Sequence, residues 1–124
     1  MLDDRIITES AKDNDAPVWN SYSDKTAWEL YLGEKAGAED ISPYAPAARM
    51  ADFAGPSPAY SFVGNIEPFY DETVAYFEKL KAAGVQAEVD VFEGCFHAFD
   101  SLGNTKPKNE AHRRLRKAFL TGLK

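Results

Sequence analysis

The segment AYSFVGNIEPFYDETVAYFEKLKAAGVQAEVDVFEG, residues 59–94, predicts two parallel strands joined by a helix. Residues 59–65 are a short apolar and aromatic run, as in a buried strand. Residues 70–84 carry apolar side chains at helical spacing behind an acidic first turn, and Gly84 marks the end of the helix. Residues 86–94 alternate in polarity, as a half-buried strand does. Strand, helix and strand in this order predict a right-handed βαβ unit.

Two further helices are predicted outside this unit. One covers residues 23–37 and has Leu30 and Tyr31 among its apolar positions. The other covers residues 108–123 and carries most of the basic side chains near the C-terminus. We expect a single α/β domain, in which an irregular and partly helical segment (residues 1–58) precedes a β-α-β-α unit (residues 59–124).

Composition places the chain among globular proteins, since 44% of its 124 residues are hydrophobic and 27% are charged. The net charge of −6 argues against nucleic acid as a partner, because a phosphate backbone requires a basic surface. The single cysteine, Cys95, cannot form an intrachain disulfide and gives no zinc-binding spacing. We therefore expect a cytoplasmic location and neither a metal nor another cofactor. Neither a signal-peptide pattern nor a run of ~20 apolar residues is found, so no membrane span is expected.

Two ionisable side chains follow the two predicted strands. Glu67 comes just after the first strand and His97 just after the second. Functional groups gather at the carboxyl ends of parallel strands, which lie ~4.8 Å apart, so these two side chains can meet. A carboxylate bonded to an imidazole would orient it as a general base. Two simpler interpretations stay open: Glu67 could merely precede a helix, and His97 could be a packed structural histidine.

Three segments of the chain form motifs in a fixed order. They are SPYAPA, EPFYDE and GCFHAFD, at residues 42–47, 67–72 and 94–100. Together with the earlier MLDDR and TAWELYLG, they resemble the C-terminal part of the hormone-sensitive-lipase-like esterases, a branch of the α/β-hydrolases. That family typically shows S-P-x-x-A-P, a D-P-L-R-D-E-like motif and G-x-x-H-G-F-D. The motifs are weak singly and specific in combination, and the resemblance covers nearly the whole chain.

The resemblance implies a partial α/β-hydrolase fold, a C-terminal βαβ unit with parallel strands and flanking helices. It also implies that Glu67 is the catalytic acid and His97 the catalytic base of a Ser-Glu-His triad for ester hydrolysis. Two positions differ from the family pattern. Glu67 stands where the family usually has Asp, which adds one methylene of reach. Ala98 stands where it usually has Gly, so we expect a crowded loop.

The family's nucleophile and oxyanion-hole motifs, G-x-S-x-G and H-G-G-G, do not occur in these 124 residues. The segment most similar to G-x-S-x-G is GPSPA at residues 55–59, where Ser57 precedes a predicted strand instead of following one. Pro58 also disfavours the helical conformation that a nucleophile elbow requires of its serine. We therefore expect a C-terminal esterase fragment that carries two of three triad positions and is inactive alone.

Other interpretations remain open for the same residues. The chain could be a non-catalytic module for self-association or partner binding, or one half of a split esterase. In the parent fold the strand at residues 59–64 has a neighbour on each side, so here it would present an open edge. We expect either a homo-oligomer, most simply a dimer, or a missing N-terminal half to cover that edge. A small ester substrate is expected only where the full site is rebuilt.

Overall fold

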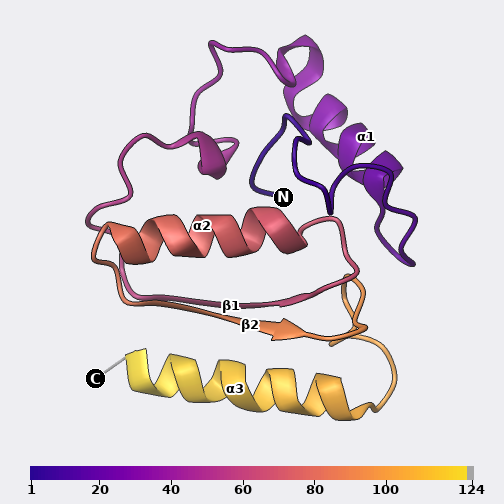
Figure 1. Cartoon of the computed structure of the whole chain (residues 1–124), viewed down its shortest axis with the longest axis vertical. Helices are drawn as coiled ribbons and strands as arrows, with labels where there is room; N and C mark the ends of the chain where they lie inside the picture. Colours follow the sequence, from indigo (N-terminus) through magenta and orange to yellow (C-terminus); the bar gives the residue numbers. More distant parts are fainter. Residues whose placement is uncertain (123–124) are drawn as a thin grey trace.

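A computed structural model describes residues 1–122 and shows a two-stranded parallel sheet with a helix on each face (Figure 1). The strands are β1 (Ala59–Gly64) and β2 (Ala87–Phe92). Helix α2 (Tyr70–Ala82) joins them and covers one face, and α3 (Lys106–Gly122) covers the other. The predicted βαβ unit and the α/β fold class are therefore confirmed.

The register of the sheet distributes the side chains of both strands between the two helices. Phe62 pairs with Asp90 and Val63 with Val91, so neighbouring pairs point to opposite faces. On the α3 side, Phe62 and Phe92 pack against a small buried cluster formed by Cys95, Phe99 and Ala111. On the α2 side, Val63 is buried together with the apolar stripe of that helix, Phe77 and Leu80.

The segment before β1 lies on the side of α2 that faces away from the sheet (Figure 1). Its main element is α1 (Ser21–Leu32), followed by short 3₁₀ turns at Gly33–Lys35 and Ala47–Arg49. The side chain of Asn20 caps α1 by accepting a hydrogen bond from the Ser23 amide. The helix therefore begins earlier than the sequence predicts.

The buried face of α1 differs from the prediction. Leu30 and Tyr31 are 84% and 67% exposed, whereas Asp24 and Trp28 are buried. At 100° per residue, Leu30 is turned well away from Trp28, and Tyr31 touches the Trp28 ring from the solvent side. The helix therefore packs through one i, i+4 pair and leaves the side chains of Tyr22, Leu30 and Tyr31 exposed.

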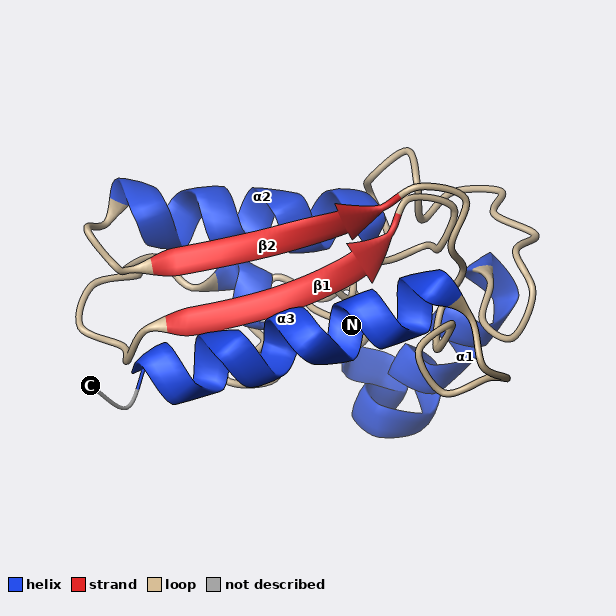
Figure 2. Cartoon of the chain, turned by 90° about the horizontal axis from the view of Figure 1, so that it is seen from below, coloured by secondary structure: helices blue, strands red, loops and turns tan. Residues whose placement is uncertain are grey.

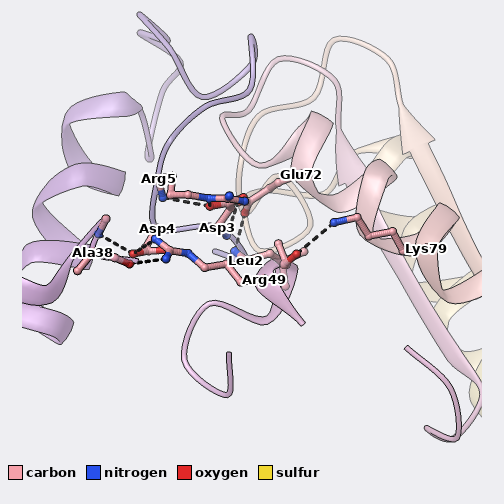
Figure 3. A network of polar contacts seen from close by, with 10 residues as sticks. Leu2, Asp3, Asp4, Arg5, Ala38, Arg49, Glu72 and Lys79 are labelled. Atoms are coloured by element: carbon pink, nitrogen blue, oxygen red, sulfur yellow. Dashed lines mark hydrogen bonds and ion pairs between the residues drawn. The ribbon is translucent and has the colours of Figure 1, made fainter. Parts of the chain in front are cut away.

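Polar contacts, and not a strand pairing, hold the first residues of the chain against α2 (Figure 3). The carboxylate of Glu72 accepts hydrogen bonds from the backbone amides of Leu2 and Asp3, at 2.8 and 2.9 Å. The guanidinium of Arg49 lies 2.8 Å from both carboxylate oxygens of Asp4. Burial raises the pKa of Glu72, and the bonds from the N-terminal segment offset part of that rise.

The structure gives β1 a single neighbour, β2, within residues 1–122, so its other edge is unpaired there. Helix α3 spans Lys106–Gly122, close to the predicted 108–123; Leu123 lies outside the described residues. Among the described residues, no helix combines the length and apolar character needed to cross a membrane.

Candidate active site

The carboxyl ends of β1 and β2 lie side by side, and a loop leaves each of them (Figure 2). Glu67 lies three residues beyond the end of β1, and His97 lies five residues beyond the end of β2. Because the two strands run parallel, both loops emerge at the same end of the sheet. The topology therefore brings together two side chains that are thirty positions apart in the sequence.

The two side chains make a direct contact. The Nδ1 atom of His97 lies 2.6 Å from Oε2 of Glu67, a short distance for an N–H···O hydrogen bond. In a neutral ring, a carboxylate partner at Nδ1 favours the tautomer with its proton on that nitrogen, and Nε2 is then an acceptor. The Glu67 side chain is 6% exposed, and that of His97 is 40% exposed. A buried carboxylate thus orients an imidazole whose other edge is accessible.

The second oxygen of Glu67 is also occupied. Its Oε1 accepts a hydrogen bond of 2.8 Å from the backbone amide of Gly64, the last residue of β1. The carboxylate is thus fixed at both oxygens, one by the strand end and one by the imidazole. The longer side chain of Glu, compared with Asp, is accommodated because it folds back onto the strand that precedes it.

The two loops meet through their backbones at Gly64. The carbonyl oxygen of Cys95 lies only 2.0 Å from the position that a Cβ atom on Gly64 would take. The amide of Ile66 donates to the same carbonyl at 3.3 Å. A residue without a side chain is therefore required where the Glu67 loop touches the His97 loop.

Aromatic rings surround the imidazole of His97. The ring centroids of Phe69 and Trp19 lie 5.0 and 5.9 Å from it, and 6.1 Å from each other. The indole N–H of Trp19 is buried without a hydrogen-bond partner among the described residues. Val18, next to Trp19, has φ of +71°, a strained value for a β-branched residue. Trp19 therefore packs against the imidazole.

Ala98, which follows the histidine, has φ of +63°. This left-handed conformation is natural for glycine and costs an alanine roughly 1 kcal/mol. The backbone of this loop is therefore strained at Ala98.

A cavity of about 430 Å³ opens beside the pair. Its walls include Glu67, Phe69 and His97, and also Met1 and Val63. Val63 belongs to β1, which is unpaired on one side, so the cavity joins the imidazole to the open strand edge. A side chain carried by a neighbouring strand could reach His97 through this space.

Ser57 is not part of this site. It precedes β1, whereas Glu67 follows it, so the two lie at opposite ends of a six-residue strand. Six residues of strand span ~20 Å. Ser57 instead lines a different cavity with Phe119 of α3.

Neither the thiol of Cys95 nor the imidazole of His112 takes part in the Glu67–His97 contact. Cys95 is buried in the core, and burial raises the pKa of its thiol, so it is not an activated nucleophile. His112 is exposed on α3, 3.4 Å from Asp100. Within residues 1–122 no group of three or more acidic, histidine or cysteine side chains could hold a metal ion.

The sequence analysis did not identify the residues that connect the N-terminal segment to the Glu67 loop and to the start of α2. Asp71 accepts a hydrogen bond from the Ser10 amide, and its own amide donates to the Ser10 hydroxyl. Asn14 donates from its side chain to the carbonyl of Ile66, in the Glu67 loop. The EPFYDE motif pointed to part of this arrangement. Its last two carboxylates accept hydrogen bonds from the N-terminal segment, whereas its first, Glu67, contacts His97.

Comparison with known proteins agrees with the α/β fold of the chain. Residues 1–101 match the model of a family described as alpha/beta hydrolase fold. Among curated proteins, Esterase LipI of Mycobacterium tuberculosis is 29% identical over 104 residues, which is 84% of this chain and 32% of that protein.

Solved structures give a similar result. Bacterial heroin esterase superposes on the whole chain with a TM-score of 0.94 and 30% identity, and the match covers 40% of that esterase. Esterase LipW from Mycobacterium marinum superposes on 96% of the chain with a TM-score of 0.79 and 29% identity, over 38% of its own length. The chain thus spans only 32–40% of the length of these relatives.

Proposed function

The chain belongs to the alpha/beta hydrolase fold family, and on that premise we propose that it supplies the acid and the base of a serine esterase triad. The observation that carries the proposal is the 2.6 Å contact between Glu67 and Nδ1 of His97, at the carboxyl ends of adjacent parallel strands. Catalytic groups of open α/β sheets gather at this edge. The similarity to several esterases favours carboxylic esters as the substrate class.

In the proposed reaction His97 acts first as a base and then as an acid. Its Nε2 accepts the proton of a serine hydroxyl as the oxygen attacks the ester carbonyl, and it then returns the proton to the departing alcohol. Glu67 keeps the proton on Nδ1 and stabilises the imidazolium formed between these steps. A water molecule, deprotonated by the same nitrogen, hydrolyses the acyl-enzyme.

The serine must come from polypeptide outside these 124 residues. They contain neither G-x-S-x-G nor H-G-G-G, and Ser57 lies at the wrong end of β1. The cavity along the unpaired edge of β1 leads to His97, which suits a nucleophile on a neighbouring strand. The nucleophile-bearing segment would be either a further part of the same polypeptide or a separate chain.

The 124-residue chain alone should therefore be almost inactive. Removing a triad nucleophile lowers turnover by about 10⁶, and this chain also lacks the oxyanion-hole motif that would preserve a residual rate. Hydrolysis of p-nitrophenyl acetate tests this: we expect no turnover above that of free imidazole at the same concentration. Robust hydrolysis that Ser57→Ala abolishes would overturn the proposal, and Cys95→Ala is the matched control.

A further inference from the structure

The amide side chain of Asn65 joins the loop of Glu67 to the loop of His97. Its Nδ2 donates a hydrogen bond of 2.5 Å to Oε2 of Glu93, and its Oδ1 accepts one of 2.7 Å from the amide of Gly94. Both partners belong to the turn that follows β2 and leads to His97. Asn65 itself lies between the end of β1 and Glu67, so one side chain holds both loops.

The backbone of Asn65 also forms a hydrogen bond to the end of β2. Its amide donates to the carbonyl of Phe92, the last residue of β2, at 3.1 Å. Asn65 therefore makes three hydrogen bonds across to the second loop, to the carbonyl of Phe92, the carboxylate of Glu93 and the amide of Gly94. Gly94 has φ of +68°, so the turn that receives these bonds has a left-handed residue at its centre.

We propose that Asn65 is a positioning residue for the Glu67–His97 pair. It acts through the turn at Glu93 and Gly94, which begins four residues before His97 in the sequence, and it has no contact with the reacting atoms. The bond to Glu93 is charge-assisted, so it is stronger than a bond between neutral groups. This inference rests on the proposed function, because it concerns the geometry of the proposed acid and base.

Asn is suited to this position because it offers a donor and an acceptor on one planar group. Asp would keep the acceptor for the Gly94 amide but would place a second carboxylate against Glu93. The like charges would repel, and the Nδ2 donor would be lost. Asn65→Asp therefore removes the hydrogen bond to Glu93 with almost no change in the shape of the side chain.

The test measures the Nδ1 proton of His97 by NMR on the 124-residue chain. A proton in a short hydrogen bond to a carboxylate resonates far downfield and exchanges slowly with water. We expect that resonance in the wild-type chain. In Asn65→Asp its exchange should be about tenfold faster, or the line broadened away, as expected when a charge-assisted bond that closes a loop is lost.

The reversed pair provides the decisive variant. In Asn65→Asp combined with Glu93→Gln, the amide lies on residue 93 and the carboxylate on residue 65, so the bond can form again and the resonance should recover. Asn109→Asp is the matched control, because Asn109 donates to Asn104 at an exposed position on α3. It should leave the His97 resonance unchanged.

Each outcome has a separate meaning. If the wild-type chain is folded and lacks the downfield resonance, the Glu67–His97 pair and the proposed function are wrong. If the resonance is present and Asn65→Asp leaves it unchanged, the pair stands and the role of Asn65 is wrong. The same conclusion follows if the folded double variant does not recover. Should Asn65→Asp not fold, Glu93→Ala removes only an exposed partner, and an unaltered resonance in that variant would also refute the inference.

Discussion

Replacing Gly64 by alanine should separate the two loops that carry Glu67 and His97. The added Cβ would lie 2.0 Å from the carbonyl oxygen of Cys95 and 2.5 Å from its carbonyl carbon. Real Cβ atoms essentially never approach closer than 3.0 Å, so the two backbones would have to move apart by about 1 Å. The obstacle is backbone, so no side-chain rotation can relieve it. A similar movement at His97 would stretch its 2.6 Å contact with Glu67 beyond hydrogen-bond reach.

The energetic cost follows from the same contact. Overpacking costs about 1–3 kcal/mol, and loss of the hydrogen bond from Ile66 to the Cys95 carbonyl adds about 1 kcal/mol. We expect Gly64→Ala to lower the free energy of unfolding by about 2–4 kcal/mol, measured by urea denaturation followed by circular dichroism. Gly122→Ala is the matched control, because open space surrounds that position. A Gly64→Ala chain with the wild-type urea midpoint would refute the reasoning.

Three other predictions concern the strained loop, a buried acid and the open edge. Ala98→Gly should raise the free energy of unfolding by about 0.5–1 kcal/mol, because φ at this position is +63°; an unchanged or lower value in urea denaturation would contradict this. Burial, reinforced by the charge of Glu72, raises the pKa of Asp24 from 3.8 to about 6. Between about pH 4 and 6 the folded state therefore binds this proton more tightly than the unfolded state, so the free energy of unfolding should fall as the pH rises through that range. Asp24→Asn should remove up to about 3 kcal/mol of that fall, so the unfolding free energy should depend less steeply on pH. An unchanged slope would contradict the burial argument. Finally, the unpaired edge of β1 predicts self-association at micromolar concentration, and sedimentation equilibrium showing only a 13.7 kDa species would exclude it.

The βαβ unit could be predicted because its periodicities are local. An apolar run, a helical stripe that ends before Gly84 and an alternating strand each depend on neighbouring residues, and the observed elements agree with them within a few residues. The meeting of Glu67 and His97 also follows from topology, since parallel strands bring their carboxyl ends together. Their catalytic role remains a prediction.

The arrangement of the first fifty residues could not be predicted in the same way. It depends on contacts between distant positions, such as the carboxylate of Glu72 with the amides of Leu2 and Asp3. Which face of α1 is buried follows from that arrangement, and the apolar pattern of the helix does not show that Leu30 is exposed. The contacts of Asn65 depend on the paths of two loops, which no periodicity in the sequence specifies.

A chimeric enzyme tests the central claim most directly. In this chimera, the 40% of bacterial heroin esterase that superposes on this chain, with a TM-score of 0.94, is replaced by this chain. We expect the chimera to hydrolyse p-nitrophenyl acetate, and His97→Ala or Glu67→Ala to lower its turnover by a factor on the order of 10⁴ or more. A folded chimera that is inactive, or whose turnover neither substitution changes, would contradict the assignment of these two residues as the acid and base of the triad.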